Sequence, residues 1–455
     1  MNIPTRLAIS TLSLGLAGFI STLNAASLTW DQGGATPAAP NSVAGTWDTT
    51  NAYWSNIIAN PGAPTDSIWN NTNNDTAIFT GGAGYTVTLG TPITVGGLEF
   101  NTSTGISVNI LLQSSTLTLA GGATTTIKVT DVAALTTISS AITGSSGLTK
   151  TGSGGLQLSS ASNNYSGNTT MSGGSLRIGV TNGLSTASAL VMTSGTLEMQ
   201  GNSQTVTGLT GASGNTIRNR AAGTSVFTVN GSSATTYAGS LTDQSTNVNQ
   251  LLALKTDGTS QLTLSNTSGL TFHGATTITG TSTLKLNAGA NLTNTSSVTV
   301  SGGTLTSASG NINLGVGATS MSSGNITPAG VGTVGTFTLA ASQTFTTTGG
   351  TLNFDIGGTF DQIISLGSGT FSLTNTTLAL SGLTSVAGTY QLFTGFTSGS
   401  VNNLNITGLT GGFTGSLDNT GLLTVSAIPE PSTYAALAGA SMLGFAAFRR
   451  RRSVR

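Results

Sequence analysis

Short runs of alternating aliphatic and hydroxyl residues follow one another along most of this 455-residue chain. Typical runs are Thr116–Leu119 (TLTL), Ser297–Val300 (SVTV) and Thr336–Leu339 (TFTL). Successive side chains of a β-strand point to opposite faces, so each run predicts a strand with one aliphatic and one hydroxyl face. Glycines separate the runs, and no amphipathic helix pattern of convincing length appears between them. The pattern therefore predicts an all-β body.

Composition narrows the choice of architecture. The chain contains 64 glycines and no cysteine, and charged residues make up only 6% of it, far below the usual ~25%. Neither disulfides nor thiolate metal sites can hold such a chain together. Burial and backbone pairing must supply the stability, and short glycine-rich strands achieve this in a solenoid, where every rung buries its aliphatic face on the next.

An internal duplication supports a repetitive fold. The segments 146–179 and 255–286 align at their strand positions, with Leu156 matching Leu262 and Leu176 matching Leu284. The offset between the two copies stays nearly constant from one end of the alignment to the other. A repeat of this kind predicts that each copy forms the same set of strands.

Both copies resemble the autotransporter-associated β-strand repeat. This repeat begins with lysine-threonine-glycine and continues through a leucine-x-leucine strand, an aromatic-x-glycine turn, a threonine-threonine strand and a glycine-glycine-x-leucine strand. The first copy has all five parts, whereas in the second Asp257 replaces the first glycine and Thr281 and Ser282 replace the glycine pair. The resemblance implies an elongated parallel β-helix of the passenger-domain type, which we expect over residues 141–345.

Two flanking modules look like parts often seen around such repeats, an N-terminal β module at 26–140 and a C-terminal β module at 346–426. The first contains all four tryptophans of the chain, Trp30, Trp47, Trp54 and Trp69. One interpretation is a cap that covers the apolar end of the first rung. The other is a glycan-binding site, since aromatic faces stack on sugar rings.

The last residues have a different pattern. The run 434–448 (YAALAGASMLGFAAF) is apolar on every side, and five arginines follow it. It has 15 residues, against the roughly 20 needed to cross a ~30 Å hydrocarbon core. Its place beside a basic cluster nevertheless favours a membrane segment over a buried core helix. We predict a single transmembrane helix over 434–448, its arginines on the cytoplasmic side: Arg449, Arg450, Arg451, Arg452 and Arg455.

The first residues agree with export. Arg6 precedes the apolar run 7–20, and Leu23–Ala25 offers small or neutral residues suited to cleavage. Residues 1–25 are therefore predicted to be a signal peptide. We expect the protein to be exported and then retained, temporarily or permanently, at a membrane.

Pro429, Glu430 and Pro431 stand just before the apolar run. Because proline disfavours helix, we expect 427–432 to be an extended stalk. This tripeptide, the apolar segment and the terminal arginines resemble the PEP-CTERM sorting signal of bacterial exported proteins, here at 427–455. The resemblance implies that a membrane-embedded exosortase of the inner membrane recognises the tail and processes it near the tripeptide. It says nothing about activity.

Residues that could carry out catalysis have simpler structural interpretations. His273 is the only histidine and lies at the turn of the second repeat, so a multi-histidine metal site is impossible. Asp355 and Asp361 have the spacing of paired glycosidase carboxylates, but the glycines between them suggest a hairpin whose aspartates bond backbone amides. Gly330–Gly335 has GxGxxG spacing, yet a β run follows it instead of a helix.

The basic residues give no further site. Between residues 26 and 426 they look dispersed, with only Arg218 and Arg220 close together. No basic or aromatic-rich module accompanies the C-terminal arginines, so nucleic-acid binding is not expected. We predict no catalytic residue, no metal and no cofactor.

These observations predict a non-enzymatic structural protein of the cell surface or extracellular matrix, processed by an exosortase and in contact with extracellular polysaccharide. Two alternatives remain open. One is a carbohydrate-binding surface protein that uses the tryptophans. The other is a polysaccharide lyase or hydrolase on a β-helix, with a site that the sequence does not identify.

Overall fold

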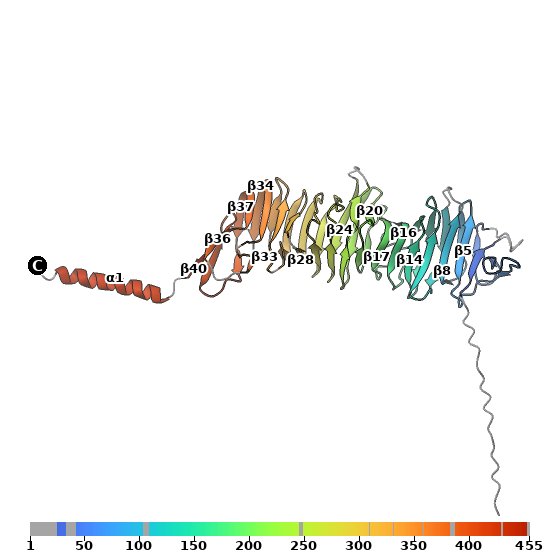
Figure 1. Cartoon of the computed structure of the whole chain (residues 1–455), viewed down its shortest axis with the longest axis horizontal. Helices are drawn as coiled ribbons and strands as arrows, with labels where there is room; N and C mark the ends of the chain where they lie inside the picture. Colours follow the sequence, from blue (N-terminus) through green and yellow to red (C-terminus); the bar gives the residue numbers. More distant parts are fainter. Residues whose placement is uncertain are drawn as a thin grey trace, which may run out of the picture.

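The computed structural model of the chain is an elongated β-solenoid of about 13 turns (Figure 1). It describes residues 25–32, 42–102, 109–244, 249–308, 310–330, 332–357, 359–382, 387–428 and 431–452. All but the last residue of the predicted signal peptide lies outside this part of the chain, as do Pro429, Glu430 and Arg455.

The strands nearest the N-terminus are β1 (Ser27–Trp30), β2 (Gly45–Trp47), β3 (Trp54–Ser55), β4 (Asp66–Ser67), β5 (Thr76–Gly81), β6 (Tyr85–Leu89), β7 (Ile93–Val95), β8 (Gly97–Thr102), β9 (Asn109–Ser114), β10 (Leu117–Leu119), β11 (Thr124–Val129), β12 (Leu135–Ile138) and β13 (Ile142–Thr143).

The central strands are β14 (Gly147–Thr151), β15 (Gly155–Leu158), β16 (Thr169–Ile178), β17 (Leu190–Glu198), β18 (Gln204–Val206), β19 (Leu209–Gly211), β20 (Thr216–Asn219), β21 (Gly223–Val229), β22 (Ala234–Tyr237), β23 (Ser240–Asp243), β24 (Gln250–Thr256), β25 (Gln261–Leu264), β26 (Thr276–Thr279), β27 (Thr283–Leu286), β28 (Ser297–Ser307), β29 (Gly310–Asn313) and β30 (Ala318–Thr327).

The remaining elements are β31 (Gly335–Leu339), β32 (Thr344–Thr347), β33 (Thr351–Asp355), β34 (Gln362–Thr374), β35 (Thr377–Ser381), β36 (Gly388–Gln391), β37 (Phe393–Asn402), β38 (Asn405–Thr407), β39 (Phe413–Leu417), β40 (Leu422–Ala427) and the helix α1 (Pro431–Arg452).

Parallel pairing between successive rungs builds the solenoid. Leu156 pairs with Leu176, Leu176 with Leu197, and Leu197 with Ile217, all in register. These side chains are fully buried, so each rung lays its aliphatic face on the one before, and the ladder forms a continuous core. The alternation seen in the sequence therefore folds as predicted, into a mostly β, parallel solenoid.

Antiparallel pairs of strands occur only at the two ends of the described solenoid. At the N-terminal end β3 pairs antiparallel with β1 and with β4. At the C-terminal end β40 pairs antiparallel with β36 and β39. A stack of parallel strands would otherwise leave open edges at both ends, and these strands cover part of them.

Parallel pairing crosses the boundaries between the predicted modules. Ile138 pairs with Leu158 across position 140, and Ser320 pairs with Thr346 across position 345. The backbone thus forms one continuous ladder at both places. The division into modules at 26–140, 141–345 and 346–426 stays a prediction.

The glycine pair of the repeat has a steric origin. Gly174 has φ of +63°, and a Cβ atom there would lie 2.3 Å from the carbonyl oxygen of Gly154 on the neighbouring rung. Only glycine fits a left-handed backbone at such a close approach. In the second copy Gly280, and not the Thr281 and Ser282 expected from the alignment, takes this part, with φ of +64° and the carbonyl oxygen of Gly258 2.7 Å from its Cβ position.

Helix α1 bears on two expectations. It begins at Pro431, inside the segment expected to be extended, because proline at a first helical position loses no hydrogen bond that the helix needs. No helix in the described ranges is both long and apolar enough to cross a membrane, so the transmembrane helix predicted over 434–448 is not confirmed. The apolar run would span only about 22 Å at ~1.5 Å per residue, against a core of ~30 Å.

Candidate functional site

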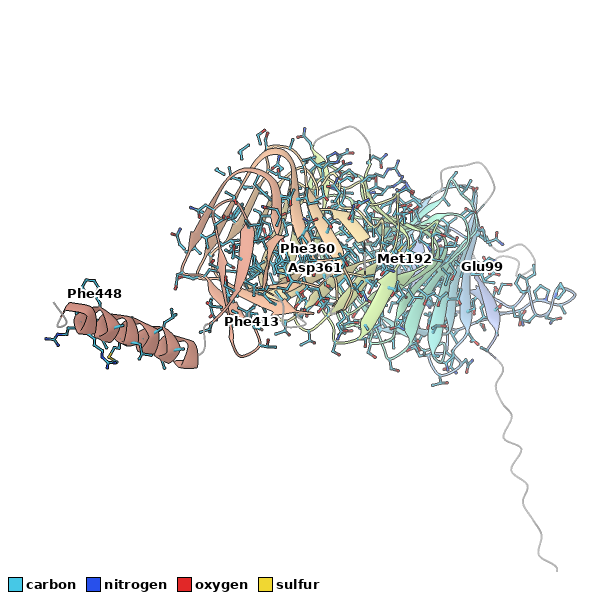
Figure 2. All side chains as sticks on the ribbon, turned by 60° about the vertical axis from the view of Figure 1, so that its left-hand side comes forward. Glu99, Met192, Phe360, Asp361, Phe413 and Phe448 are labelled. Carbon is cyan, nitrogen blue, oxygen red and sulfur yellow. The ribbon has the colours of Figure 1, made fainter. Side chains whose placement is uncertain are left out.

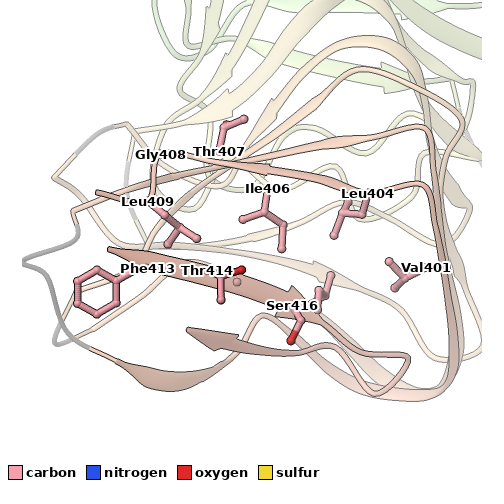
Figure 3. Close-up of a pocket in the computed structure, with 11 residues that line it drawn as sticks. Val401, Leu404, Ile406, Thr407, Gly408, Leu409, Phe413, Thr414 and Ser416 are labelled. Atoms are coloured by element: carbon pink, nitrogen blue, oxygen red, sulfur yellow. The ribbon is translucent and has the colours of Figure 1, made fainter. Parts of the chain in front are cut away.

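A groove of about 530 Å³ with a mixed apolar and polar lining lies at the C-terminal end of the solenoid (Figure 3). Val401, Leu404 and Ile406 line it from the last parallel rung, and Leu409 and Phe413 line it from the loop and start of β39. The other lining residues are glycines, serine, threonines and leucine. The groove can therefore hold apolar groups, but it offers no acid, base or metal ligand.

The tail leaves the solenoid close to this groove. The amide of Ile428 donates a hydrogen bond of 2.7 Å to the carbonyl of Gly412, in the loop just before β39. Beyond Ile428 the described chain resumes as α1, which extends away from the last rung (Figure 1). The junction is thus anchored on the solenoid side.

Helix α1 presents apolar side chains to its surroundings on all sides. Phe448 lies on the part of the helix far from the solenoid (Figure 2). Exposed helices of soluble domains usually have one polar face, whereas the large side chains of α1 from Leu437 to Phe448 are all apolar. Those that are at least 60% exposed are Leu437, Met442, Leu443, Phe445 and Phe448.

The predicted sorting residues fall partly in this helix. Arg449 and Arg450 are exposed in its last turns, and Arg451 and Arg452 end it. Pro431 is its first residue, whereas Pro429, Glu430 and Arg455 lie outside the described residues. The arginines therefore continue the helix directly after its apolar stretch.

Comparison with known families decides what this tail is. Residues 427–452 match the PEP-CTERM protein-sorting motif. The chain carries this sorting signal. Residues 148–178 match the passenger-associated-transport-repeat, which covers β14, β15 and β16. The resemblances of the tail and of the first repeat copy are thus confirmed.

One relative is similar to part of this chain. The adhesin BmaC autotransporter of Brucella suis biovar 1 (strain 1330) is 44% identical over 172 residues, which is 38% of this chain. The chain spans about 5% of the length of that relative. The similarity therefore concerns a segment of a much larger protein.

The four tryptophans lie together at the N-terminal end of the solenoid and are at most 1% exposed. The ring centroids of Trp47 and Trp54 are 4.7 Å apart, and those of Trp54 and Trp69 are 4.8 Å apart. Trp30 packs edge-on against Trp54 at 5.2 Å. The rings bury one another, so they have no free face on which a sugar could stack. This packing is the one expected of a cap, and glycan binding by Trp30, Trp47, Trp54 and Trp69 stays an untested hypothesis.

His273 forms a dyad with a buried aspartate. Its Nδ1 lies 2.7 Å from Oδ2 of Asp243, and its backbone amide donates to the same oxygen at 2.9 Å. The amide of Leu252 donates to Oδ1 of Asp243 at 2.6 Å. The carboxylate of Asp243 thus accepts from the backbone amides of Leu252 and His273 and contacts the His273 ring at the turn of the second repeat. Within the described residues, no serine or threonine hydroxyl joins this dyad as a nucleophile would.

Asp355 and Asp361 come together as the sequence suggested, and Figure 2 labels Asp361. Asp361 accepts hydrogen bonds from the amides of Gly335 at 2.7 Å and Asp355 at 2.9 Å. Asp355 accepts from the amides of Gly332 and Thr333. Burial raises the pKa of Asp361 to about 6, despite these two amide hydrogen bonds and with help from the nearby charge of Asp355. Both carboxylates therefore hold the backbone of residues 332–335 through its amides. Gly335 begins the strand β31, so no helix follows the GxGxxG sequence.

A cluster of charged residues was not evident in the sequence. Arg177, Arg218 and Arg220 all contact the carboxylate of Glu198. One rung of chain separates Arg177 from Glu198, and another separates Glu198 from Arg218, so the solenoid brings together side chains that look dispersed along the chain. Only the register between β16, β17 and β20 reveals the cluster.

Proposed function

We propose that this protein is exported and that an exosortase recognises its C-terminal tail, after which the solenoid is presented at the cell surface or in the extracellular matrix. The continuity between the two parts carries the proposal. The solenoid ends with β40 at Ala427, which is also the first residue of the matched sorting motif. A peptidase that acts at this junction would release a folded solenoid.

The exposed apolar side chains of α1 favour binding of this helix to an apolar partner or to lipid. A helix that leaves Leu443 and Phe445 more than 70% exposed is stabilised when these groups leave water. The membrane-embedded sorting peptidase and the lipid around it provide such a place. The inner membrane is thus the proposed site of temporary retention.

The outer surface of the solenoid supports a structural or adhesive role in place of catalysis. Consecutive rungs place small uncharged polar side chains in register, for example Thr304, Asn325, Thr351 and Thr377. Such a ladder gives a long hydrated surface without acids or bases. The similarity to a segment of an autotransporter adhesin also favours contact with an external surface.

The sorting proposal is tested by replacing Pro429, Glu430 and Pro431 with alanines. Pulse-chase labelling in a host with a functional exosortase should show that this variant stays full-length and membrane-associated. A matched control replaces three exposed residues of a distant loop, Asn60–Gly62, with alanines, and it should be shortened like the unmodified chain. If the tripeptide variant is shortened and released at the normal rate, the tail is not a processing signal.

The non-enzymatic role is tested at the dyad of His273 and Asp243. We expect His273→Ala to leave the thermal melting temperature and surface presentation almost unchanged, because Asp243 keeps its two backbone donors. A polysaccharide lyase or hydrolase activity that is present in the unmodified protein and lost in this variant would favour the enzyme alternative. The glycan-binding alternative has no comparable support, since all four tryptophans are buried.

A further inference from the structure

Three arginines surround one carboxylate on the side of the solenoid. Arg177 of β16, Glu198 of β17 and Arg218 of β20 occupy the same outward position on three successive rungs. Arg220 follows just after β20. The distances to Glu198 oxygens are 2.8 Å from Nε of Arg177, 2.6 Å from Nη2 of Arg218 and 3.1 Å from Nη1 of Arg220.

The charges in this cluster do not balance. The side chain of Glu198 is only 2% exposed, and one guanidinium would neutralise it. The other two leave an excess of positive charge. Burial by itself would raise the pKa of Glu198, but the hydrogen bond from Arg218 and the charges of Arg177 and Arg220 hold it below its usual range. The carboxylate therefore stays ionised and keeps the three arginines together.

The arginines are accessible and have spare donors. Their side chains are 27%, 31% and 39% exposed for Arg177, Arg218 and Arg220. Gln200 also donates to Glu198, at 3.3 Å, so the carboxylate accepts from four side chains at once. Nε of Arg218 is buried and has no acceptor within the described structure, so the donors open to a ligand are the outer nitrogens of the guanidinium groups. Each guanidinium has several N–H donors in a fixed plane, and most of these are not used by Glu198.

The surroundings favour an extended, hydroxyl-bearing ligand. Gln157 lies in register one rung before Arg177, and Thr242 lies one rung after Arg218. The outward column therefore reads Gln157, Arg177, Glu198, Arg218 and Thr242, at a rung spacing of about 4.8 Å. The three arginines of the cluster are the only ones between residues 26 and 426. A body with so few cations concentrates its guanidinium groups in one place, flanked by neutral hydrogen-bonding side chains.

We propose that Arg177, Arg218 and Arg220 form a binding subsite for the carboxylate or sulfate groups of an anionic polysaccharide that lies along the solenoid axis. Planar guanidinium groups bind such anions through paired hydrogen bonds. Gln157 and Thr242 bind hydroxyl groups of the neighbouring sugars. Glu198 positions the guanidinium groups and does not contact the ligand. The subsite is independent of the sorting tail.

Titration calorimetry of the intact chain with three polymers tests the proposal. Polygalacturonate provides carboxylates, dextran sulfate provides sulfates, and dextran is neutral. We expect binding to at least one anionic polymer and none to dextran, with affinity that falls as salt rises. Arg220→Gln and Arg177→Gln should each weaken binding by about tenfold or more, the effect of losing a charged hydrogen bond. Lys285→Gln removes one exposed positive charge elsewhere on the solenoid and should leave affinity unchanged.

Further variants distinguish binding by the planar guanidinium groups from non-specific electrostatic attraction of a polyanion. Arg220→Lys keeps the charge but loses the planar donors, so it should recover only part of the affinity. Melting temperatures of all variants verify folding, and if Arg220→Gln unfolds, Arg220→Lys replaces it. The proposal fails if neither anionic polymer binds at low salt, if dextran binds equally well, or if Lys285→Gln costs as much affinity as Arg220→Gln. Equal affinity for single-stranded DNA would also overturn it, since a non-specific polyanion surface would then suffice.

Discussion

The buried ammonium group of Lys150 donates a hydrogen bond to the carbonyl oxygen of Gly173, 3.2 Å away on the next rung of the solenoid. Two further bonds go to the carbonyls of Thr151 at 2.9 Å and Gly152 at 3.1 Å. Lys150 is fully buried and is the first residue of the lysine-threonine-glycine sequence in the repeat. The lysine of the motif thus connects two rungs at the glycine turn.

The stability of the solenoid should therefore depend on pH above neutrality. Burial lowers the pKa of Lys150 from 10.5 to about 8. The unfolded chain then binds more protons than the folded chain between these two values, so the free energy of unfolding rises as pH increases from about 8 to 10.5. The gain is on the order of 3 kcal/mol for a shift of this size.

Urea denaturation at several pH values from about 7.5 to about 10 measures this effect. Lys150→Met keeps the length of the side chain and removes the titrating group, so it should lack the rise seen in the unmodified protein. Tyrosine ionisation affects both proteins alike, and the difference between the two curves isolates Lys150. Parallel curves over this range would show that the ammonium is not buried in solution.

The second repeat shows how far sequence alignment can go. Its lysine, Lys255, is partly exposed and pairs with Asp257 at 2.8 Å, while Thr256 takes the buried position. A slip of one residue moves a strand side chain to the opposite face. The leucines that follow the slip stay in phase, because Leu262 and Leu284 pair in register as Leu156 and Leu176 do. Alternation therefore predicted the strands and the core, but not the environment of each polar side chain.

The cluster of arginines around Glu198 could not be predicted from the sequence for a related reason. Whether Arg177 meets Glu198 depends on the length of a rung, and this length varies along the chain. The rung that leads from Leu148 to its partner Thr169 is shorter than the rung that leads from Phe371 to its partner Gly399. Alternating patterns define the faces of a strand but not the rung length, so contacts across rungs require the structure.

Burial of the tryptophans could not be read from the sequence either. A cap and a sugar platform use the same residue type, and only the packing of the rings distinguishes them. Trp54 packs against the other three tryptophans, which come from separate short segments of the N-terminal end. Because the four tryptophans are unevenly spaced along the chain, no periodic pattern in the sequence predicts that their rings meet.

Gly174→Ala should destabilise the solenoid strongly. The substitution places a Cβ atom 2.3 Å from a backbone carbonyl oxygen, at a φ of +63° that alanine rarely adopts. We expect a loss of roughly 2 kcal/mol or more in the free energy of unfolding. Gly62→Ala is the matched control, since nothing lies within 4 Å of its Cβ position. Equal melting temperatures for the two variants would show that the rungs are further apart than the structure indicates.

Trp54→Ala tests what the tryptophan cluster does. Trp54 is fully buried and packs against three other tryptophans, so truncation should lower the free energy of unfolding by about 3–5 kcal/mol. Ile58, which is 61% exposed nearby, provides the control, and Ile58→Ala should change stability little. Loss of glycan retention in Trp54→Ala at an unchanged melting temperature would instead point to a sugar-binding cluster.

Acidic pH should stabilise the C-terminal part of the solenoid through Asp361. Its pKa is raised from 3.8 to about 6, with burial as the main cause, so the folded state holds a proton that the unfolded state has already lost between these values. The contribution to stability is full below about pH 4 and disappears as pH rises through about 6. Asp361→Asn stays neutral at every pH and keeps an oxygen that can accept a hydrogen bond from the amide of Gly335. Thermal melting from about pH 4 to about pH 7 should therefore show a smaller loss of stability in this variant than in the unmodified protein. Identical slopes would mean that the carboxylate ionises normally and that its amide hydrogen bonds offset its burial.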